Sequence, residues 1–259
     1  MSFVLLHGLG ADRRQPLDLF GPVLADAGVA PADVVAPDVR AHGASTLLGG
    51  PDDFALDRLA DEVAETVRRD APRAPTTPLT LIGISMGAAI ALRLALRGSL
   101  PVERAVFVRP AFGDAPLPPN LRPFPVIGEL LRERGPVAGA EAFRRTEPHH
   151  RVAAESPLGA RGLLMQFTAP GAAARAVRLV EIPRNRAFAD DAELAGLAAR
   201  GVRSVVVGAP RDPVHPLALA ERWAAGLGAP LEHVPARDDG VAAQAAAMRE
   251  VVGRRLSRP

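Results

Sequence analysis

The amino-acid sequence predicts an α/β protein in which a mostly parallel sheet is flanked by helices. Short apolar segments rich in strand-forming residues alternate along the chain with segments whose apolar residues recur at helical spacing. Such alternation is typical of parallel strands joined by helical crossovers, which cover both faces of the sheet. The 259 residues, of which 48% are hydrophobic, are enough for one large domain or for one domain with an insertion.

The first strand is expected at 3–8, where the apolar run FVLLHG ends at a glycine. A helix follows at 16–28, because leucine, phenylalanine and valine side chains share one helical face and a glycine stands at its end. The segment DVVAPDV at 33–39 predicts the next strand. Apolar residues at helical spacing then predict a helix at 55–70.

Strand and helix follow one another directly in the middle of the chain. LTLIGI, residues 79–84, predicts a buried strand, and MGAAIALRLALRG, residues 86–98, predicts a helix. A further strand is expected at 104–109, from RAVFVR. The pattern resumes near the end of the chain with a strand at 202–208, then a helix at 216–228, a short strand at 230–235 and a last helix at 241–256.

The alternation is interrupted between residues 112 and 200. This stretch opens with the proline-rich segment GDAPLPPNLRPFP, which suits neither a strand nor a helix interior, and continues with helical segments. We interpret 112–200 as a helical cap or lid inserted into a core formed by 1–111 and 201–259. Inserted at the carboxyl edge of the sheet, it would cover the region where such folds bind ligands.

Composition excludes several classes of function. The chain has no cysteine, so thiolate metal sites are excluded, and no other metal-ligating cluster stands out. A net charge of +2 and 4% aromatic residues argue against nucleic-acid binding. No apolar run approaches the roughly 20 residues of a membrane span, and the first ten residues do not read as a signal peptide. We therefore expect a cytoplasmic protein with a small-molecule substrate and no cofactor; its oligomeric state cannot be read.

The segment GISMG, residues 83–87, is the main candidate for chemistry. A G-x-S-x-G turn between a strand and a helix presents its serine above the sheet at the helix N-terminus, where a nucleophile is placed. Ser85 is the candidate nucleophile. The loop HGLG after the first strand is the second part of the site, because the backbone N–H groups of Leu9 and Met86 would together form an oxyanion hole.

A third motif, PDVRAHGAS at residues 37–45, completes a resemblance. Together with HGLG and GISMG it resembles the α/β-hydrolase superfamily, within the group of small esterases, C–C hydrolases and haloperoxidase-like enzymes. The resemblance implies an α/β-hydrolase fold with about six strands and a helical lid. It also implies structural rather than catalytic roles for His7, Arg40 and His42. Ala41 stands where the family commonly has glycine.

The resemblance assigns an acid but leaves the base open. Asp212, in GAPRDPVHP, matches the family's aspartate after a strand, where it would orient a histidine, which is the favoured role; the alternative is that it only caps the next helix. The family's histidine follows the last strand, but this chain has ARDDG there. His215 is our first choice of base, because only a short loop separates it from Asp212. A lid histidine ranks second and an aspartate of ARDDG third: His149 or His150, then Asp238 or Asp239. His233 is expected to be an ordinary strand residue.

The expected function is hydrolysis of an ester or thioester in a carbonyl-containing small molecule, through Ser85 with a non-standard base. Two alternatives remain open. The same pocket would serve a cyclase or lyase of specialised metabolism, in which Ser85 polarises a carbonyl, or the chain is a catalytically silent binding protein. Arg109, at the end of the strand after the nucleophile helix, either pairs with a substrate carboxylate or lies at the surface.

Overall fold

The computed structural model describes residues 2–70 and 77–256, so residues 1, 71–76 and 257–259 of the predicted core lie outside the described residues. Its strands form a six-stranded sheet in the order β2-β1-β3-β4-β5-β6, and each neighbouring pair is parallel. The predicted parallel sheet is confirmed. The strands are β1 (Ser2–Leu6), β2 (Val34–Val35), β3 (Leu79–Ile84), β4 (Val102–Val108), β5 (Arg203–Gly208) and β6 (Leu231–His233).

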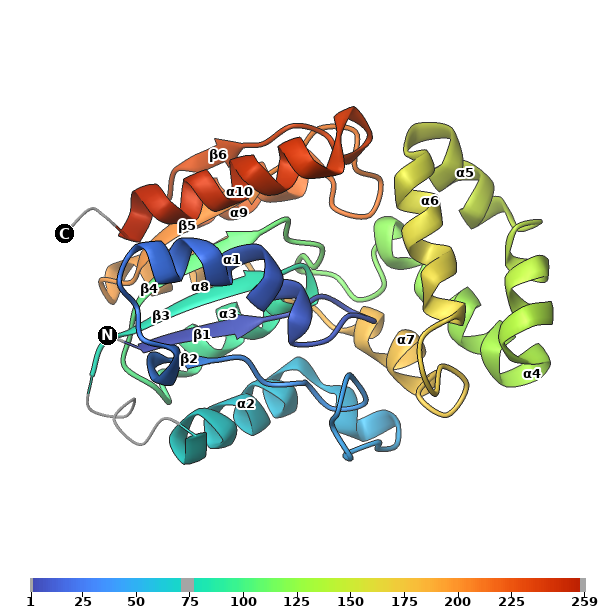
Figure 1. Ribbon diagram of the computed structural model, residues 1–259, viewed down its shortest axis with the longest axis horizontal. Helices are drawn as coiled ribbons and strands as arrows, with labels where there is room; N and C mark the ends of the chain where they lie inside the picture. Colours follow the sequence, from blue (N-terminus) through green and yellow to red (C-terminus); the bar gives the residue numbers. More distant parts are fainter. Residues whose placement is uncertain (1, 71–76, 257–259) are drawn as a thin grey trace.

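Helices cover both faces of the sheet (Figure 1). One layer holds α1 (Arg14–Asp26) and α10 (Val241–Leu256), and the other holds α2 (Leu56–Asp70), α3 (Met86–Arg97), α8 (Asp191–Ala199) and α9 (Leu217–Leu227). Successive side chains of a strand point to opposite faces. In β1, Phe3 and Leu5 pack in the α1 and α10 layer, whereas Val4 and Leu6 pack in the other. This double burial explains the unbroken apolar runs in the sequence.

The two edge strands are shorter than the sequence predicts. The segment expected as a strand at 33–39 pairs with β1 at only two positions, Val34 and Val35. Residues 31–33 form a 3-10 turn before it, and Pro37, after it, has no N–H to donate to a sheet ladder. At the other edge β6 covers only three residues of the expected 230–235, which begins and ends with proline.

Most of the segment 112–200 lies away from the sheet. It contains α4 (Pro123–Phe143), α5 (Glu147–Glu155), α6 (Pro157–Leu164) and the short α7 (Val177–Glu181). Figure 1 shows α4, α5 and α6 together at one end of the molecule, beyond the sheet. The last helix of the segment, α8, packs instead against α9 beside the sheet, where Leu194 and Leu197 are fully buried.

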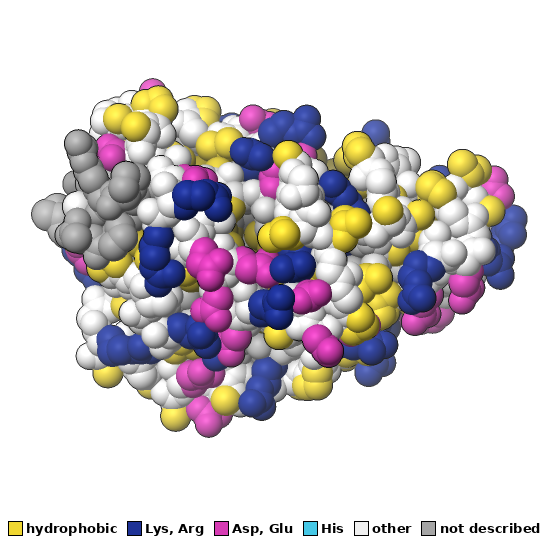
Figure 2. All heavy atoms as spheres, turned by 90° about the horizontal axis from the view of Figure 1, so that it is seen from below, with side chains coloured by type: hydrophobic (Ala, Val, Ile, Leu, Met, Phe, Trp, Pro, Cys, Tyr) yellow, Lys and Arg dark blue, Asp and Glu magenta, His cyan; other side chains and the backbone are white. Residues whose placement is uncertain are grey.

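Charged side chains of both signs are interspersed over the face that carries α2 (Figure 2). Ion pairs join α2 to α3 on this side: Arg93 lies 2.6 Å from Asp57, and Arg97 lies 3.0 Å from Asp61. Over the whole chain, 29 acidic residues nearly balance the 31 arginines, which leaves a net charge of only +2. Of the helices that the structure describes, none is both long and apolar enough to cross a membrane.

Candidate active site

Ser85 lies on a sharp turn between β3 and α3, with φ 55° and ψ −112°. The turn brings strand and helix so close that its two glycines have no room for a side chain. A Cβ at Gly83 would lie 2.2 Å from the carbonyl oxygen of Gly87, and a Cβ at Gly87 would lie 2.4 Å from the carbonyl oxygen of Leu6. The strained serine and the two glycines therefore form one local unit, which the sequence pattern predicts.

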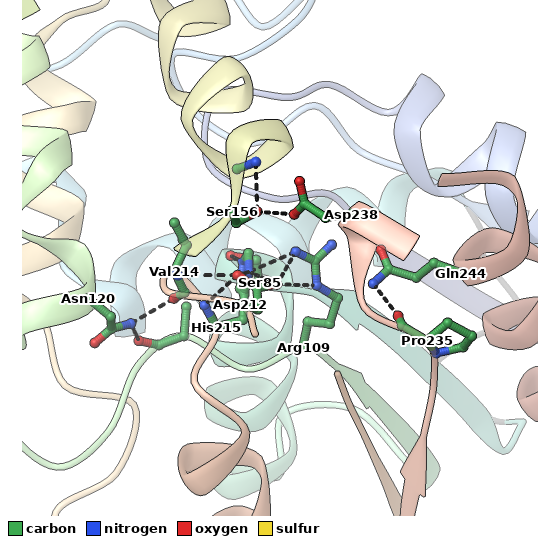
Figure 3. A network of polar contacts seen from close by, with 12 residues as sticks. Ser85, Arg109, Asn120, Ser156, Asp212, Val214, His215, Pro235, Asp238 and Gln244 are labelled. Atoms are coloured by element: carbon green, nitrogen blue, oxygen red, sulfur yellow. Dashed lines mark hydrogen bonds and ion pairs between the residues drawn. The ribbon is translucent and has the colours of Figure 1, made fainter. Parts of the chain in front are cut away.

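His215 is within hydrogen-bonding distance of both other members of a triad (Figure 3). Its Nε2 lies 2.9 Å from Oγ of Ser85, and its Nδ1 lies 3.1 Å and 3.0 Å from the two carboxylate oxygens of Asp212. The acid and the imidazole come from the same loop, between β5 and α9. The structure thus brings together the three side chains that the sequence analysis singles out.

Backbone and side-chain hydrogen bonds fold the loop that carries Asp212 and His215. Oδ1 of Asp212 accepts hydrogen bonds from the backbone N–H groups of Val214 and His215, at 3.1 Å and 3.0 Å. From the other side, the Asn120 amide donates to the carbonyl oxygens of Ala111 and Val214, at 2.9 Å and 2.8 Å. Asp212, within the loop, and Asn120, in the inserted segment, therefore both stabilise the loop conformation. Sequence reasoning did not identify Asn120.

Arg109, which was expected either to pair with a substrate carboxylate or to lie at the surface, binds Asp212 instead. It follows β4 with a φ of 50°, and its side chain is only 12% exposed. Nε of Arg109 donates to Oδ2 of Asp212 at 3.0 Å, and Nη2 binds the same oxygen. Nη2 also lies 3.0 Å from Nδ1 of His215. The guanidinium is thus bound to the acid of the site. In the sequence, only the position of Arg109 at the end of the strand that forms β4 indicated that it could lie near the site.

The charges around His215 determine its protonation. Burial alone would raise the pKa of Asp212, but His215 and Arg109 outweigh burial and hold that pKa well below its usual range. Burial lowers the pKa of His215; Asp212 opposes this shift, and Arg109 adds to it. His215 is therefore neutral at pH 7. When its Nε2 accepts the Ser85 proton, Nδ1 carries a hydrogen and donates it to Asp212. In that tautomer the Arg109 contact with Nδ1 is not a hydrogen bond.

The loop after β1 lies directly beside Ser85. A Cβ at Gly8 would be 3.5 Å from Cβ of Ser85, and the Gly8 N–H is already bound to the Gln15 side chain at 2.8 Å. Among the residues that the structure describes, the N–H groups of Leu9 and Met86 have no acceptor. Met86 is the first residue of α3, so its N–H has no partner within the helix. Both groups are thus without a bound acceptor within the described residues, and their role as an oxyanion hole stays a prediction.

His7 and His42 are completely buried and support this loop. Nδ1 of His7 donates to the carbonyl oxygen of Gly8 at 2.9 Å, and its Nε2 accepts the N–H of Val39 at 3.1 Å. The two imidazole rings pack 4.9 Å apart, and His42 donates to the carbonyl oxygen of Arg40 at 2.8 Å. Burial lowers the pKa of both histidines. Both histidines therefore hold the loops that surround Ser85.

The lower-ranked candidate bases do not contact Ser85. Asp238 accepts hydrogen bonds from the Ser156 hydroxyl and, at 2.9 Å, from the Leu158 N–H at the start of α6 (Figure 3), while Asp239 pairs with Arg211. The remaining histidines lie elsewhere: His149 packs against a phenylalanine of the inserted segment, His150 is exposed on α5, and His233 is exposed at the end of β6. No group of three or more histidine, aspartate or glutamate side chains within 2–70 and 77–256 has the arrangement of a metal site.

Solved structures with this fold are similar over nearly the whole chain. A thermophilic esterase from Thermogutta terrifontis is 20% identical, with a TM-score of 0.63 over 100% of this chain and 91% of that one. The enol-lactonase from Burkholderia xenovorans is 22% identical, with a TM-score of 0.66 over 99% and 91%. A meta-cleavage product hydrolase from Pseudomonas fluorescens is 17% identical, with a TM-score of 0.69 over 98% and 89%. At these identities the similarity shows the fold alone.

Family membership is decided by sequence. No curated protein matches the chain significantly. The family model described as the alpha/beta hydrolase fold matches residues 2–141, which is more than half of the chain and includes the HGLG, PDVRAHGAS and GISMG motifs. The chain therefore belongs to the α/β-hydrolase fold family.

Proposed function

We propose that the protein is a serine hydrolase that cleaves an ester or thioester bond in a small molecule. Ser85 is its nucleophile, His215 its general base and Asp212 the acid that orients the base. The observation that carries this proposal is the 2.9 Å distance between Oγ of Ser85 and Nε2 of His215, on an imidazole whose other nitrogen faces Asp212. A serine hydroxyl is a weak nucleophile unless such a base takes its proton.

The reaction follows from this arrangement. Nε2 of His215 takes the Ser85 proton while Oγ attacks the carbonyl carbon and the carbonyl electrons move to oxygen. The N–H groups of Leu9 and Met86 donate to this oxyanion. The imidazolium then gives its proton to the leaving oxygen or sulfur as the ester or thioester bond breaks. Water attacks the acyl-Ser85 with His215 again as base, which releases the acid and restores the serine.

Arg109 distinguishes this site from a simple triad. Asp212 stabilises the imidazolium by its negative charge, but Arg109 binds the same carboxylate and neutralises part of that charge. The consequence is a less basic imidazole that stays neutral to a lower pH. Arg109 also fixes the orientation of the Asp212 carboxylate. We assign it a positioning role on the base, exerted through Asp212.

A fluorophosphonate probe tests the proposal, since it labels only an activated serine. We expect labelling at Ser85, found by peptide mass spectrometry, together with hydrolysis of p-nitrophenyl acetate. Both should be lost in Ser85→Ala and kept in Ser204→Ala, whose serine lies near the start of β5. Labelling with no turnover of any ester or thioester would favour cyclase or lyase chemistry. Absence of labelling in a folded protein would favour a binding protein and contradict the proposal.

A further inference from the structure

Arg237 belongs to ARDDG, the segment that stands where the family resemblance expects a histidine. It begins a 3-10 turn, Arg237–Asp239, which follows β6. The two aspartates of this turn have partners of their own, Ser156 for Asp238 and Arg211 for Asp239. The Arg237 guanidinium, by contrast, takes part in none of the hydrogen bonds and ion pairs that the structure shows within 2–70 and 77–256. It is the one residue of the turn whose charge has no counter-charge bound to it there.

The Arg237 side chain lies beside α6 and near the loop that carries Asp212 and His215. A Cβ at Gly162, on α6, would lie 3.2 Å from Nη1 of Arg237, so the glycine leaves room for the guanidinium. On its other side, Arg237 is close enough to His215 for its positive charge to contribute to the lowered pKa of the imidazole. Burial lowers the pKa of Arg237 itself; Arg109 adds to this shift, and Asp212 and Asp238 oppose it. The guanidinium is thus partly buried beside the triad.

No carboxylate is bound to the Arg237 guanidinium among the described residues. Asp212 is bound by both Arg109 and His215. Asp238, whose charge also acts on Arg237, accepts hydrogen bonds from Ser156 and from the Leu158 N–H instead. Taking a guanidinium out of water without a partner is unfavourable, so such a group in a site is typically matched by an anion of the ligand.

A guanidinium with no bound carboxylate can accept an anionic group of a ligand. A carboxylate fits a guanidinium particularly well, because its two oxygens accept two parallel hydrogen bonds. We propose that Arg237 binds a carboxylate of the substrate, so that the preferred substrates are esters or thioesters that carry a free carboxylate elsewhere in the molecule. That the bound molecule is a substrate rests on the proposed function. Binding of a carboxylate at Arg237 does not depend on catalysis.

The kinetic test compares two esters of equal length. One is the mono-p-nitrophenyl ester of glutaric acid, with a free carboxylate, and the other is the corresponding p-nitrophenyl glutaramate, in which a neutral amide replaces it. At pH 8, where His215 is neutral, we expect kcat/KM to favour the carboxylate by about 10-fold to 100-fold, the usual effect of a charge-assisted hydrogen bond. In Arg237→Gln this ratio should fall to about 1. In Arg161→Gln, which changes an exposed arginine of α6, it should not change.

A binding test separates this inference from the proposed function. Glutarate should bind to Ser85→Ala in isothermal titration calorimetry, and the additional change Arg237→Gln should abolish binding at equal ionic strength. If no ester is turned over but glutarate binds through Arg237, the proposed function fails and the anion site stands. If Arg237→Gln keeps the carboxylate preference, or the wild type prefers the neutral ester, the inference is wrong. Tighter binding of inorganic phosphate than of glutarate would also contradict the carboxylate assignment.

Discussion

Nε2 of His215 lies 2.9 Å from Oγ of Ser85 although the imidazole is carried by the same loop as Asp212. The resemblance described above implies a histidine after the last strand instead. Two residues separate Asp212 from His215, and the carboxylate accepts the backbone N–H of His215 at 3.0 Å. That hydrogen bond turns the loop back on itself, so that the imidazole faces both the carboxylate and the serine. The chain thereby places an imidazole, the base that we propose, beside Ser85 without a histidine after β6.

The first prediction concerns this base. Replacing His215 by alanine removes the acceptor of the Ser85 proton, so kcat for p-nitrophenyl acetate should fall by about 10²-fold to 10⁴-fold. Labelling of Ser85 by a fluorophosphonate should slow in parallel. The matched control is His233→Ala, which removes an exposed imidazole at the end of β6 and should keep full activity. Full activity in His215→Ala would show that another group acts as the base.

Local requirements explain which parts of the structure could be predicted from sequence. The central strands are buried on both faces and therefore read as continuous apolar runs, and the turn at Ser85 needs glycine at positions 83 and 87 for lack of space. The length of β2 is decided instead by pairing at the edge of the sheet, which no local pattern reports. For that reason the segment at 33–39 was predicted too long.

The site was predictable only where its residues lie in motifs. Ser85 and Asp212 follow strands in recognisable sequence contexts, and His215 was first among several candidates because of its proximity to Asp212. The position of Arg109 depends on a contact with a residue 103 positions further along the chain. That of Asn120 depends on a contact across 94 positions. Such contacts arise when β4 and β5 pair and the inserted segment folds back, and nothing near either residue in the sequence indicates them.

The second prediction is a change in pH dependence when Arg109 is replaced. Activity requires neutral His215, so kcat/KM should rise with pH through the His215 pKa, which lies below the ordinary value of 6.5. The Arg109 charge helps to lower this pKa, so Arg109→Gln should move the acid limb to higher pH. Asp212 raises the pKa, so Asp212→Asn should move the limb to lower pH and also slow turnover, because the imidazole tautomer is no longer fixed. An acid limb that stays in place in Arg109→Gln would contradict the positioning role.

The third prediction concerns stability. Burial lowers the pKa of His7, His42 and His215 below 6.5. Between 6.5 and each folded-state pKa, the unfolded chain binds more protons than the folded protein, so stability is lost as the pH falls. Each of these histidines should reduce the free energy of unfolding by up to about 1.4 kcal/mol per pH unit in that window. Guanidinium unfolding at pH 7.5 and pH 5.5 measures the difference.

His42→Asn provides the comparison for this pH effect. The asparagine amide can still donate toward the Arg40 carbonyl oxygen, which His42 binds at 2.8 Å, but it does not titrate. We expect a lower stability at pH 7.5, because a buried ring is removed, and a smaller loss between pH 7.5 and pH 5.5. Equal stability of the wild type at the two pH values would show that these histidines are not buried in their neutral form.

The fourth prediction concerns the turn that carries Ser85. In Gly83→Ala the new methyl group would lie 2.2 Å from the carbonyl oxygen of Gly87 and 2.7 Å from the backbone nitrogen of Ala88. Both are backbone atoms of α3, so relief requires the helix to move away from the strand. Overpacking of this kind costs about 1–3 kcal/mol or more. The displaced Ser85 should also lose its hydrogen bond to His215, so a fall in melting temperature should accompany a fall in kcat.

Gly21→Ala is the matched control for that substitution. Gly21 lies inside α1, and apart from its chain neighbours and the backbone of α1 itself, no heavy atom lies within 4 Å of the position that its Cβ would take. Alanine is favoured over glycine in a helix by about 0.5–1 kcal/mol, so this variant should be at least as stable as the wild type and equally active. The two variants add the same methyl group and differ only in what it meets. Equal melting temperatures and equal kcat values for Gly83→Ala and Gly21→Ala would contradict this prediction. The strained conformation of Ser85 would then not depend on the close approach of β3 and α3.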